Sequence, residues 1–309
     1  MPDILCMGEP MLEFNRLPPG PDGRVLYLEG HGGDTSNAAI AAARSGASVG
    51  YITAIGQDAP GDSFMALWQR EGVDTATVRR DPEAPTGIYC VTHDADGHRF
   101  TFYRSGSAAS RYRAQEVPEA AIRGAKFLHV SGISQAISAS ACDAVFHAIA
   151  VAKAAGVRVS YDTNLRLSLW PAARAAAVIH AALARADLAF PSIEDARALT
   201  GLKDAEAIAD FYLRLGCPLV LLKLGPEGVL AATPERRERI PGFRVQAVDA
   251  TGAGDVFAGT FLARSVAGDD PFAAARYANA AAALSTTGYG AVAPIPHREA
   301  VEALLRTAG

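Results

Sequence analysis

The segment Asp249-Ala250-Thr251-Gly252-Ala253-Gly254-Asp255 carries the strongest signal in this chain of 309 residues. The apolar run Val256–Leu262 follows it, and we expect Phe243–Val248, just before it, to form a short strand. A strand, a glycine-rich turn and an amphipathic helix in this order gather backbone N–H groups at the positive end of a helix dipole. The segment therefore predicts an anion-binding turn, with Asp255 as a carboxylate that can handle a proton beside the anion.

Short apolar runs alternate with alanine-rich amphipathic stretches along the rest of the chain. This alternation predicts βαβ units and an α/β fold, a doubly wound, mostly parallel sheet flanked by helices. Ligands bind outside the carboxyl ends of the strands in such sheets. The predicted strands are Ile4–Gly8, Val49–Ile55, Phe127–Val130, Val157–Asp162, Leu188–Pro191, Leu219–Leu224 and Gly228–Ala232. The predicted helices are Ser36–Ser45, Ser63–Glu71, Cys142–Ala155, Ala172–Ala184, Asp204–Arg214, Asp255–Val266 and Phe272–Ser285.

A predicted hairpin interrupts this alternation. Thr86–Thr92 and Arg99–Arg104 are β-prone runs separated by a segment with an Asp-Gly pair, which is a strong hairpin signal. Because an isolated hairpin is marginally stable in water, we expect a small lid formed by residues 13–28 and 86–104. The chain has no clear repeat or linker, so residues 1–309 are predicted to form one α/β domain with this lid. The loop inside the first lid segment is marked by Pro18, Pro19, Pro21 and Gly23.

Composition excludes several classes of protein. Lys and Arg total 29 against 33 Asp and Glu, so the net charge of -4 predicts neither a nucleic acid nor an anionic membrane as partner. The strongest apolar run, Pro218–Leu222, is far shorter than the ~20 residues that cross a bilayer. Asp3 stands where a secretory leader has basic residues, so we expect a cytoplasmic protein. The widely spaced cysteines predict buried thiols rather than a zinc site; they are Cys6, Cys90, Cys142 and Cys217.

A second glycine-rich segment, Gly32-Gly33-Asp34-Thr35-Ser36-Asn37, precedes a predicted helix near the N-terminus. Together with residues 249–255, it resembles the two signatures of the ribokinase-like (phosphofructokinase B) family of sugar kinases, although Ala250 replaces the usual threonine. The resemblance extends over essentially the whole chain. It implies a doubly wound sheet with a β-sheet lid. Because this lid often forms dimers in the family, the resemblance also implies a homo-oligomer. The implied cofactors are ATP and Mg²⁺.

Four further segments resemble the 2-keto-3-deoxygluconate kinases of this family. Arginine and tyrosine donors suit the carboxylate of a sugar acid, whereas a neutral ketose needs only hydroxyl-directed groups. The resemblance therefore implies transfer of phosphate from ATP to the 6-hydroxyl of 2-keto-3-deoxygluconate. The four segments are Gly8–Phe14, Phe102–Arg104, Ser131–Ser134 and Asp162–Arg166, the last with Trp170 nearby.

Matched position by position, the resemblance also implies roles for individual residues. Asp255 would be the general base that takes the proton of the 6-hydroxyl. The N–H groups implied to bind the transferring phosphoryl group belong to Gly252, Ala253 and Gly254. The residues implied to bind sugar hydroxyls are Gly33, Asp34 and Asn37, and those implied to hold the sugar acid are Tyr89, Tyr103, Arg104 and Arg166. The residues implied to line the ATP site are Asn164, Lys223, Gly225, Gly228, Gly252, Gly254 and Asn279. Glu13 aligns with a sugar-binding acid of many relatives, or else is a solvated strand residue.

Two departures from the family pattern affect the predicted site. The segment Ser192-Ile193-Glu194-Asp195 replaces the magnesium-linked N-x-x-E motif, so Asp195 is the candidate ligand, acting on Mg²⁺ through water. Phe102 replaces a tyrosine of the lid motif, which removes one hydroxyl contact with the substrate. The residues near Asp249 and Gly290 leave open whether a monovalent cation also binds.

Other functions are open as alternatives. A fructokinase or ribokinase of the same family would share the nucleotide residues and differ only in the sugar pocket. A non-catalytic sugar- or nucleotide-binding protein would have no need of Asp255. A nicotinamide-dependent dehydrogenase and a P-loop kinase are disfavoured, because no strand leads into G-x-G-x-x-G and the motif G-x-x-x-x-G-K-[ST] is absent.

Overall fold

A computed structural model describes residues 1–309 except for residues 21, 95–96 and 308–309. Within the described residues, nine strands form one sheet in the order β13-β12-β11-β10-β9-β8-β1-β4-β5. The strands from β11 to β5 pair in parallel, whereas β12 and β13 are antiparallel to their neighbours. These strands are β1 (Ile4–Met7), β4 (Val49–Gly56), β5 (Val78–Asp81), β8 (Phe127–Ser131), β9 (Arg158–Asp162), β10 (Leu188–Phe190), β11 (Val220–Lys223), β12 (Gly228–Ala232) and β13 (Arg237–Pro241).

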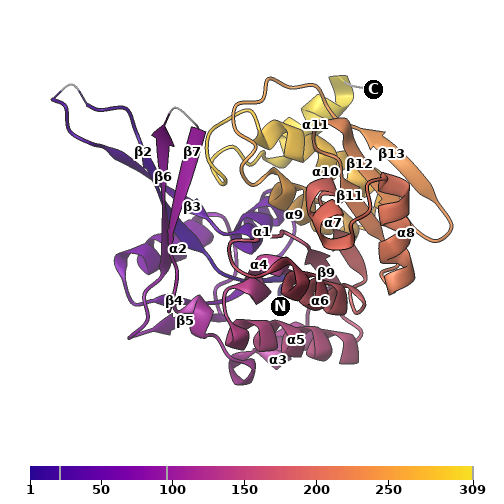
Figure 1. Ribbon diagram of the computed structural model, residues 1–309, viewed down its shortest axis with the longest axis horizontal. Helices are drawn as coiled ribbons and strands as arrows, with labels where there is room; N and C mark the ends of the chain where they lie inside the picture. The colour runs from indigo at the N-terminus through magenta and orange to yellow at the C-terminus, as the bar shows by residue number, and fades with distance from the viewer. Residues whose placement is uncertain (21, 95–96, 308–309) are drawn as a thin grey trace.

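Helices cover both faces of this sheet (Figure 1). In β1, Leu5 and Met7 belong to one hydrophobic core, whereas Ile4 and Cys6 belong to the core on the opposite face. Strands buried on both faces are continuously apolar, which explains the short apolar runs of the sequence. The helices are α1 (Asp34–Arg44), α2 (Ala59–Arg70), α3 (Glu119–Arg123), α4 (Gly132–Ala136), α5 (Ala139–Ala154), α6 (Ala172–Leu183), α7 (Ile193–Thr200), α8 (Ala205–Leu215), α9 (Ala253–Val266), α10 (Pro271–Ser285) and α11 (Arg298–Thr307).

A second, four-stranded sheet stands beside the main body in the order β3-β2-β6-β7 (Figure 1), and we call it the lid. The predicted fold class is thus confirmed. The first lid segment is longer than the predicted 13–28, because β2 and β3 pair over their full length, from Met11 with Gly32 to Arg16 with Tyr27. Pro21 and the Ala95-Asp96 part of the hairpin turn lie outside the described residues. The lid strands are β2 (Met11–Arg16), β3 (Tyr27–Gly32), β6 (Gly87–Asp94) and β7 (Gly97–Tyr103).

The strand predicted at Phe243–Val248 is wrong. The preceding strand is β13, and its pairing with β12 ends at Pro241 opposite Gly228. The segment that follows is irregular and runs along the edge of a cleft. Its last N–H group, that of Val248, donates to the carbonyl of Thr286 at 2.7 Å instead of to a strand. The chain therefore enters the glycine-rich turn from a loop anchored to the end of α10.

Two composition-based expectations can be compared with the structure. Within the described ranges, no helix is long and apolar enough to cross a membrane. All four cysteines are free thiols; three are buried and Cys90 is half-buried. The prediction of unpaired, largely buried thiols is therefore confirmed.

Helices α1 and α9 touch at a glycine, and this contact positions the ends of both helices. A methyl group at Gly259 would lie 2.0 Å from the carbonyl oxygen of Ala38, which is far inside van der Waals contact. The absence of a side chain at Gly259 lets the two helix backbones approach directly. Within two turns before these residues, each helix begins at one of the two glycine-rich segments of the sequence.

We predict that Gly259→Ala lowers the free energy of unfolding by about 1–3 kcal/mol, because the added methyl group overpacks the contact between α1 and α9. Urea denaturation measures this loss. The matched control is Gly124→Ala, where the new methyl group would clash with the flexible end of Met1 alone and would be 3.6 Å from the carbonyl oxygen of Ala121. Equal stability of the two variants would contradict the importance of this helix contact.

Candidate active site

A cleft of about 1500 Å³ lies between the lid and the main sheet. The lid contributes Met11, Tyr89 and Phe102 to its walls. The main sheet contributes Asp162, the last residue of β9, and Lys223, the last residue of β11. The cleft therefore opens at the carboxyl ends of parallel strands, where doubly wound sheets bind their ligands.

Apart from Glu13, for which the sequence left two alternatives, the cleft brings together all but one of the predicted site residues. Tyr103 is the exception, because successive residues of a strand point to opposite faces and Phe102 is the one that lines the cleft. Tyr103 lies outside, with 61% of its surface exposed, so its position does not support a role in holding the sugar acid. The predicted residues that line the cleft are Gly33, Asp34, Asn37, Tyr89, Arg104, Asn164, Arg166, Asp195, Lys223, Gly225, Gly228, Gly252, Ala253, Gly254, Asp255 and Asn279.

The glycine-rich turn has the geometry of an anion site. Gly252 adopts a left-handed conformation, with a φ of 79°, and α9 begins at the next residue. The N–H groups of Gly254 and Asp255 have no acceptor among the described residues. Both belong to the first turn of a 14-residue helix, where unpaired N–H groups and the helix dipole favour a negative charge.

Asp255 is held between polar groups from other segments. Asn37, in the first turn of α1, donates from Nδ2 to its carboxylate at 2.9 Å. Burial, reinforced by the negative charge of nearby Asp34, raises the pKa of Asp255 to about 8. A carboxyl group with a pKa near neutrality is suited to take up and release a proton.

Two buried oxygen atoms beside Asp255 are left without partners. Asn164 donates from Nδ2 to one oxygen of Asp34 at 3.1 Å, but the other, Oδ1, accepts no hydrogen bond among the described residues. The amide oxygen of Asn37 is equally unpartnered. Buried acceptors normally find donors, so these two atoms fit a ligand that brings hydroxyl groups into the cleft.

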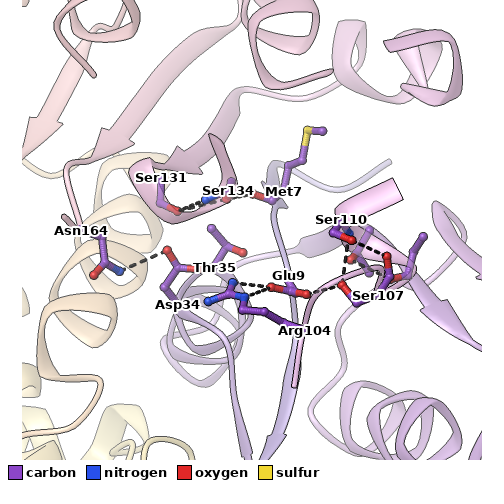
Figure 2. Close-up of polar contacts among 12 residues, drawn as sticks. Met7, Glu9, Asp34, Thr35, Arg104, Ser107, Ser110, Ser131, Ser134 and Asn164 are labelled. Carbon is purple, nitrogen blue, oxygen red and sulfur yellow. Dashed lines mark hydrogen bonds and ion pairs between the residues drawn. The ribbon is translucent and has the colours of Figure 1, made fainter. Parts of the chain in front are cut away.

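Arg104 is held by a carboxylate that the sequence analysis did not single out. Figure 2 shows the Arg104 guanidinium directed at Glu9, which is 1% exposed. Nε donates to Oε2 of Glu9 at 2.8 Å, Nη2 contacts the same oxygen, and Ser107 Oγ donates to Oε1 at 2.5 Å. Burial raises the pKa of Glu9, and the charge of Arg104 opposes that shift. Arg104 therefore lines the cleft with an acidic partner already beside its guanidinium.

Arg166, unlike Arg104, has no carboxylate partner in the described part of the chain. It lies in the loop after β9, and its Nη1 donates to the carbonyl of Leu165 at 2.9 Å. In the described part of the chain, no carboxylate forms an ion pair with its guanidinium. Its charge lowers the pKa of Asp34, although burial outweighs this effect. Arg166 thus offers the cleft a cation with unused hydrogen-bonding capacity.

Asp195 lines the cleft as a firmly positioned carboxylate. Its Oδ2 accepts from Thr163 Oγ1 at 2.9 Å and from the N–H of Leu165 at 3.0 Å. Among the described residues, no group of three His, Cys, Asp or Glu side chains could hold a metal ion. Magnesium usually binds through one or two carboxylates, water and substrate phosphates, so a single anchored carboxylate fits it.

Glu13 lies behind the cleft wall rather than in it. Tyr89, which lines the cleft, donates its hydroxyl to Glu13, and the two residues face each other across β2 and β6. Glu13 is 7% exposed, so the solvated alternative for this residue is wrong. It orients Tyr89 toward the cleft.

Sequence reasoning also missed several residues that line the cleft, among them Glu9, Phe100 and Arg244. Glu9 stands in a quoted motif, but its partner is 95 residues away, so no local pattern links the two. Phe100 and Phe102 follow from strand alternation once the direction of Arg104 is known. Arg244 was not considered as a cleft residue, because its segment was predicted as a strand and no motif includes it.

Comparison with known proteins places this architecture in a family. The profile described as "pfkB family carbohydrate kinase" matches residues 1–298. The chain belongs to the pfkB family of carbohydrate kinases, and it is a sugar kinase of that family.

Individual relatives narrow the function only in part. The chain is 35% identical to a 2-dehydro-3-deoxygluconokinase of Thermoproteus tenax, over 99% of this chain and 95% of that protein. It is also 35% identical to fructokinase-1 of Zea mays, over 99% of this chain and 98% of that protein. Among solved structures, a fructokinase of Xylella fastidiosa with bound ATP superimposes with a TM-score of 0.90 and 29% identity, covering 99% of this chain and 98% of that one.

The raised pKa of Asp255 predicts how stability depends on pH. Between its ordinary pKa of 3.8 and about 8, the folded protein binds a proton that the unfolded chain does not. The free energy of unfolding contributed by this group therefore falls as pH rises through that window, by at most about 1.4 kcal/mol per pH unit. Urea denaturation at pH 6 and pH 8 measures the slope, which should be smaller in Asp255→Asn.

The control for this slope is Asp143→Asn, which removes an exposed carboxylate. It should behave as the wild type does. Identical slopes in the wild type and Asp255→Asn would contradict the assignment of a retained proton to the cleft.

Proposed function

We propose that the protein transfers the γ-phosphoryl group of ATP to the 6-hydroxyl of 2-keto-3-deoxygluconate. The observation that carries this proposal is Arg166, a cleft-lining guanidinium without a carboxylate partner among the described residues. A cation with free donors in a sugar site is suited to a substrate carboxylate, which a neutral ketose lacks. The similarity to the kinase of Thermoproteus tenax supports the same choice.

The side chains around Asp255 have distinct parts in the proposed reaction. Asp255 takes the proton of the 6-hydroxyl, and Asn37 holds its carboxylate in place at 2.9 Å. Asp34 and Asn37 accept hydrogen bonds from sugar hydroxyls through their unpartnered oxygens. Tyr89, fixed by Glu13, closes the site from the lid.

The other half of the cleft is assigned to the nucleotide. Asn279, in α10, donates to the carbonyl of Pro241 at 2.8 Å and so fixes the segment that borders this half. The N–H groups of Gly254 and Asp255 bind phosphate oxygens. Bound Mg²⁺, held by Asp195 through water, would neutralise charge on the phosphates.

The proposal predicts a substrate preference. In an ADP-release assay with Mg·ATP, 2-keto-3-deoxygluconate should exceed its galactonate epimer, gluconate, fructose and ribose, with kcat/KM at least tenfold above fructose. Arg166→Ala should raise KM for the acid far more than KM for ATP, because the lost guanidinium contacts only the sugar. Arg174→Ala, which removes an exposed arginine of α6, is the matched control.

Other outcomes of this assay decide between the alternatives. Faster turnover of fructose or ribose would overturn the assignment of Arg166 and favour a kinase for neutral sugars, the function of the maize relative. No turnover of any sugar would favour a non-catalytic binding protein. An equal rise of both KM values in Arg166→Ala would indicate damage to the fold rather than a role in sugar binding.

A second prediction concerns the proton. Asp255→Asn keeps the size of the side chain but removes the base, so kcat should fall by about 10²–10⁴-fold. The dissociation constant for ATP, measured by calorimetry, should stay within about threefold, because the N–H groups that bind phosphate are unchanged. Near-normal turnover of the variant would show that Asp255 is not the base.

A further inference from the structure

Lys223 and Asp162 form a buried ion pair on the floor of the cleft. The two residues end β11 and β9, which lie on either side of β10 and point the same way. Lys223 Nζ donates to Asp162 Oδ2 at 2.6 Å, and the two side chains are only 16% and 5% exposed. Removing such a pair from water is costly, so its presence in the cleft calls for an explanation beyond stability.

The ammonium group lies against the anion-binding turn. A methyl group at Gly254 would be 3.1 Å from Lys223 Nζ, so the end of the lysine lies close to the backbone of the turn, where a larger residue would crowd it. The unpaired N–H groups of Gly254 and Asp255 start from the same stretch of backbone. A negative group bound by those N–H groups would therefore meet a positive side chain as well.

The Lys223 ammonium is surrounded by carboxyl groups of the cleft, whose negative charge it can offset. Asp34, Asp162 and Asp255 all line the cleft, and each opposes an incoming phosphate when its carboxyl group is ionised. Lys223 is the only lysine that lines the cleft in the described part of the chain. Its charge lowers the pKa of Asp255, which shows that its field reaches the base.

We propose that Lys223 is a catalytic residue whose ammonium contacts the phosphoryl group during transfer, and that Asp162 is the positioning residue that holds it there. This inference rests on the proposed kinase reaction but not on the identity of the sugar. The attacking hydroxyl oxygen forms the new O–P bond, and the bond from phosphorus to the bridging oxygen breaks, leaving its electron pair on ADP. The hydroxyl proton goes to Asp255. Lys223 keeps its proton and balances the charge on the phosphoryl oxygens.

Asp162 also connects the two halves of the cleft. Its second oxygen, Oδ1, accepts from the N–H of Asn164 at 3.1 Å, and Asn164 in turn donates to Asp34. Asn164 has a φ of 28°, the only positive value at a non-glycine residue in the described chain. One carboxylate thus fixes the ammonium on the phosphate side and a strained backbone turn on the sugar side.

The first test replaces Lys223 with methionine, which keeps the length of the side chain but not its charge. In Lys223→Met, kcat should fall by about 10²–10³-fold on whichever panel sugar the wild type turns over best. The dissociation constant for Mg·ADP should change by less than about threefold, because ADP lacks the transferred group. Lys223→Arg should recover part of the lost kcat. The exposed Lys203→Met is the matched control and should behave as the wild type does.

Two further measurements separate this role from damage to the fold. Lys223→Met leaves Asp162 as an unpaired buried charge, so the double variant Lys223→Met/Asp162→Asn, which removes that charge, should show the same loss of kcat. With the whole sugar panel present, aluminium fluoride, a planar substitute for the transferring phosphoryl group, should tighten Mg·ADP binding at least tenfold in the wild type and not in Lys223→Met.

The proposal is overturned if Lys223→Met keeps kcat within tenfold, or loses affinity for Mg·ADP as much as it loses turnover. It is also overturned if aluminium fluoride tightens Mg·ADP binding equally in both proteins or in neither. A wild-type preference for fructose would instead refute 2-keto-3-deoxygluconate as the substrate, and it would leave the predictions for Lys223→Met unchanged.

Discussion

The organisation of the cleft follows from the repulsion among three carboxylates that lie close together, Asp34, Asp162 and Asp255. Each would be costly to bury as an unpaired anion, and each has a different partner. Asn37 donates to Asp255 and Asn164 donates to Asp34, whereas only Asp162 receives a full positive charge. Burial raises the pKa values of Asp34 and Asp255, and the hydrogen bond from Asn37 opposes the shift of Asp255 without cancelling it.

This arrangement requires segments far apart in the sequence to meet. The carboxylates come from the start of α1, the end of β9 and the start of α9, and the partner lysine comes from the end of β11. Parallel strands bring β9 and β11 to one edge of the sheet. The contact between Gly259 and Ala38 then sets the spacing of the two helices, so that Asn37 reaches Asp255 over a sequence separation of 218 residues.

Local sequence signals were sufficient for the fold and for most of the cleft. The central strands of the main sheet were predicted because they are apolar on both faces, and the glycine-rich turn because it joins small residues to a helix start. The edge strands β5 and β13 were missed, because most of their residues are partly or fully exposed and form no apolar run. The failures have specific causes. Tyr103 was assigned from a motif without regard to strand alternation, and the apolar residues Phe243, Val245 and Ala247 line a cleft instead of pairing in a strand. The pairing of Glu9 with Arg104 depends on lid geometry, which no local pattern encodes.

The two arginines of the cleft differ in what they can select. Glu9 accepts from Arg104 through one oxygen and from Ser107 through the other, and several donors around a carboxylate favour its ionised form. Burial raises the pKa of Glu9, and the Arg104 charge and the Ser107 hydrogen bond oppose that shift. Arg104 thus already has an acidic partner inside the protein, and part of its hydrogen-bonding capacity is used there.

Arg166 has no such compensating carboxylate in the described chain, and it lies in the loop after β9 rather than on the lid. A substrate carboxylate gains most from a cation whose charge is not already balanced. Under the proposed function, we therefore expect discrimination between an acid and a neutral sugar to depend on this loop rather than on the lid strand that leads to Arg104. The chain is 35% identical both to a 2-dehydro-3-deoxygluconokinase and to a fructokinase, so overall sequence identity does not separate the two kinds of substrate.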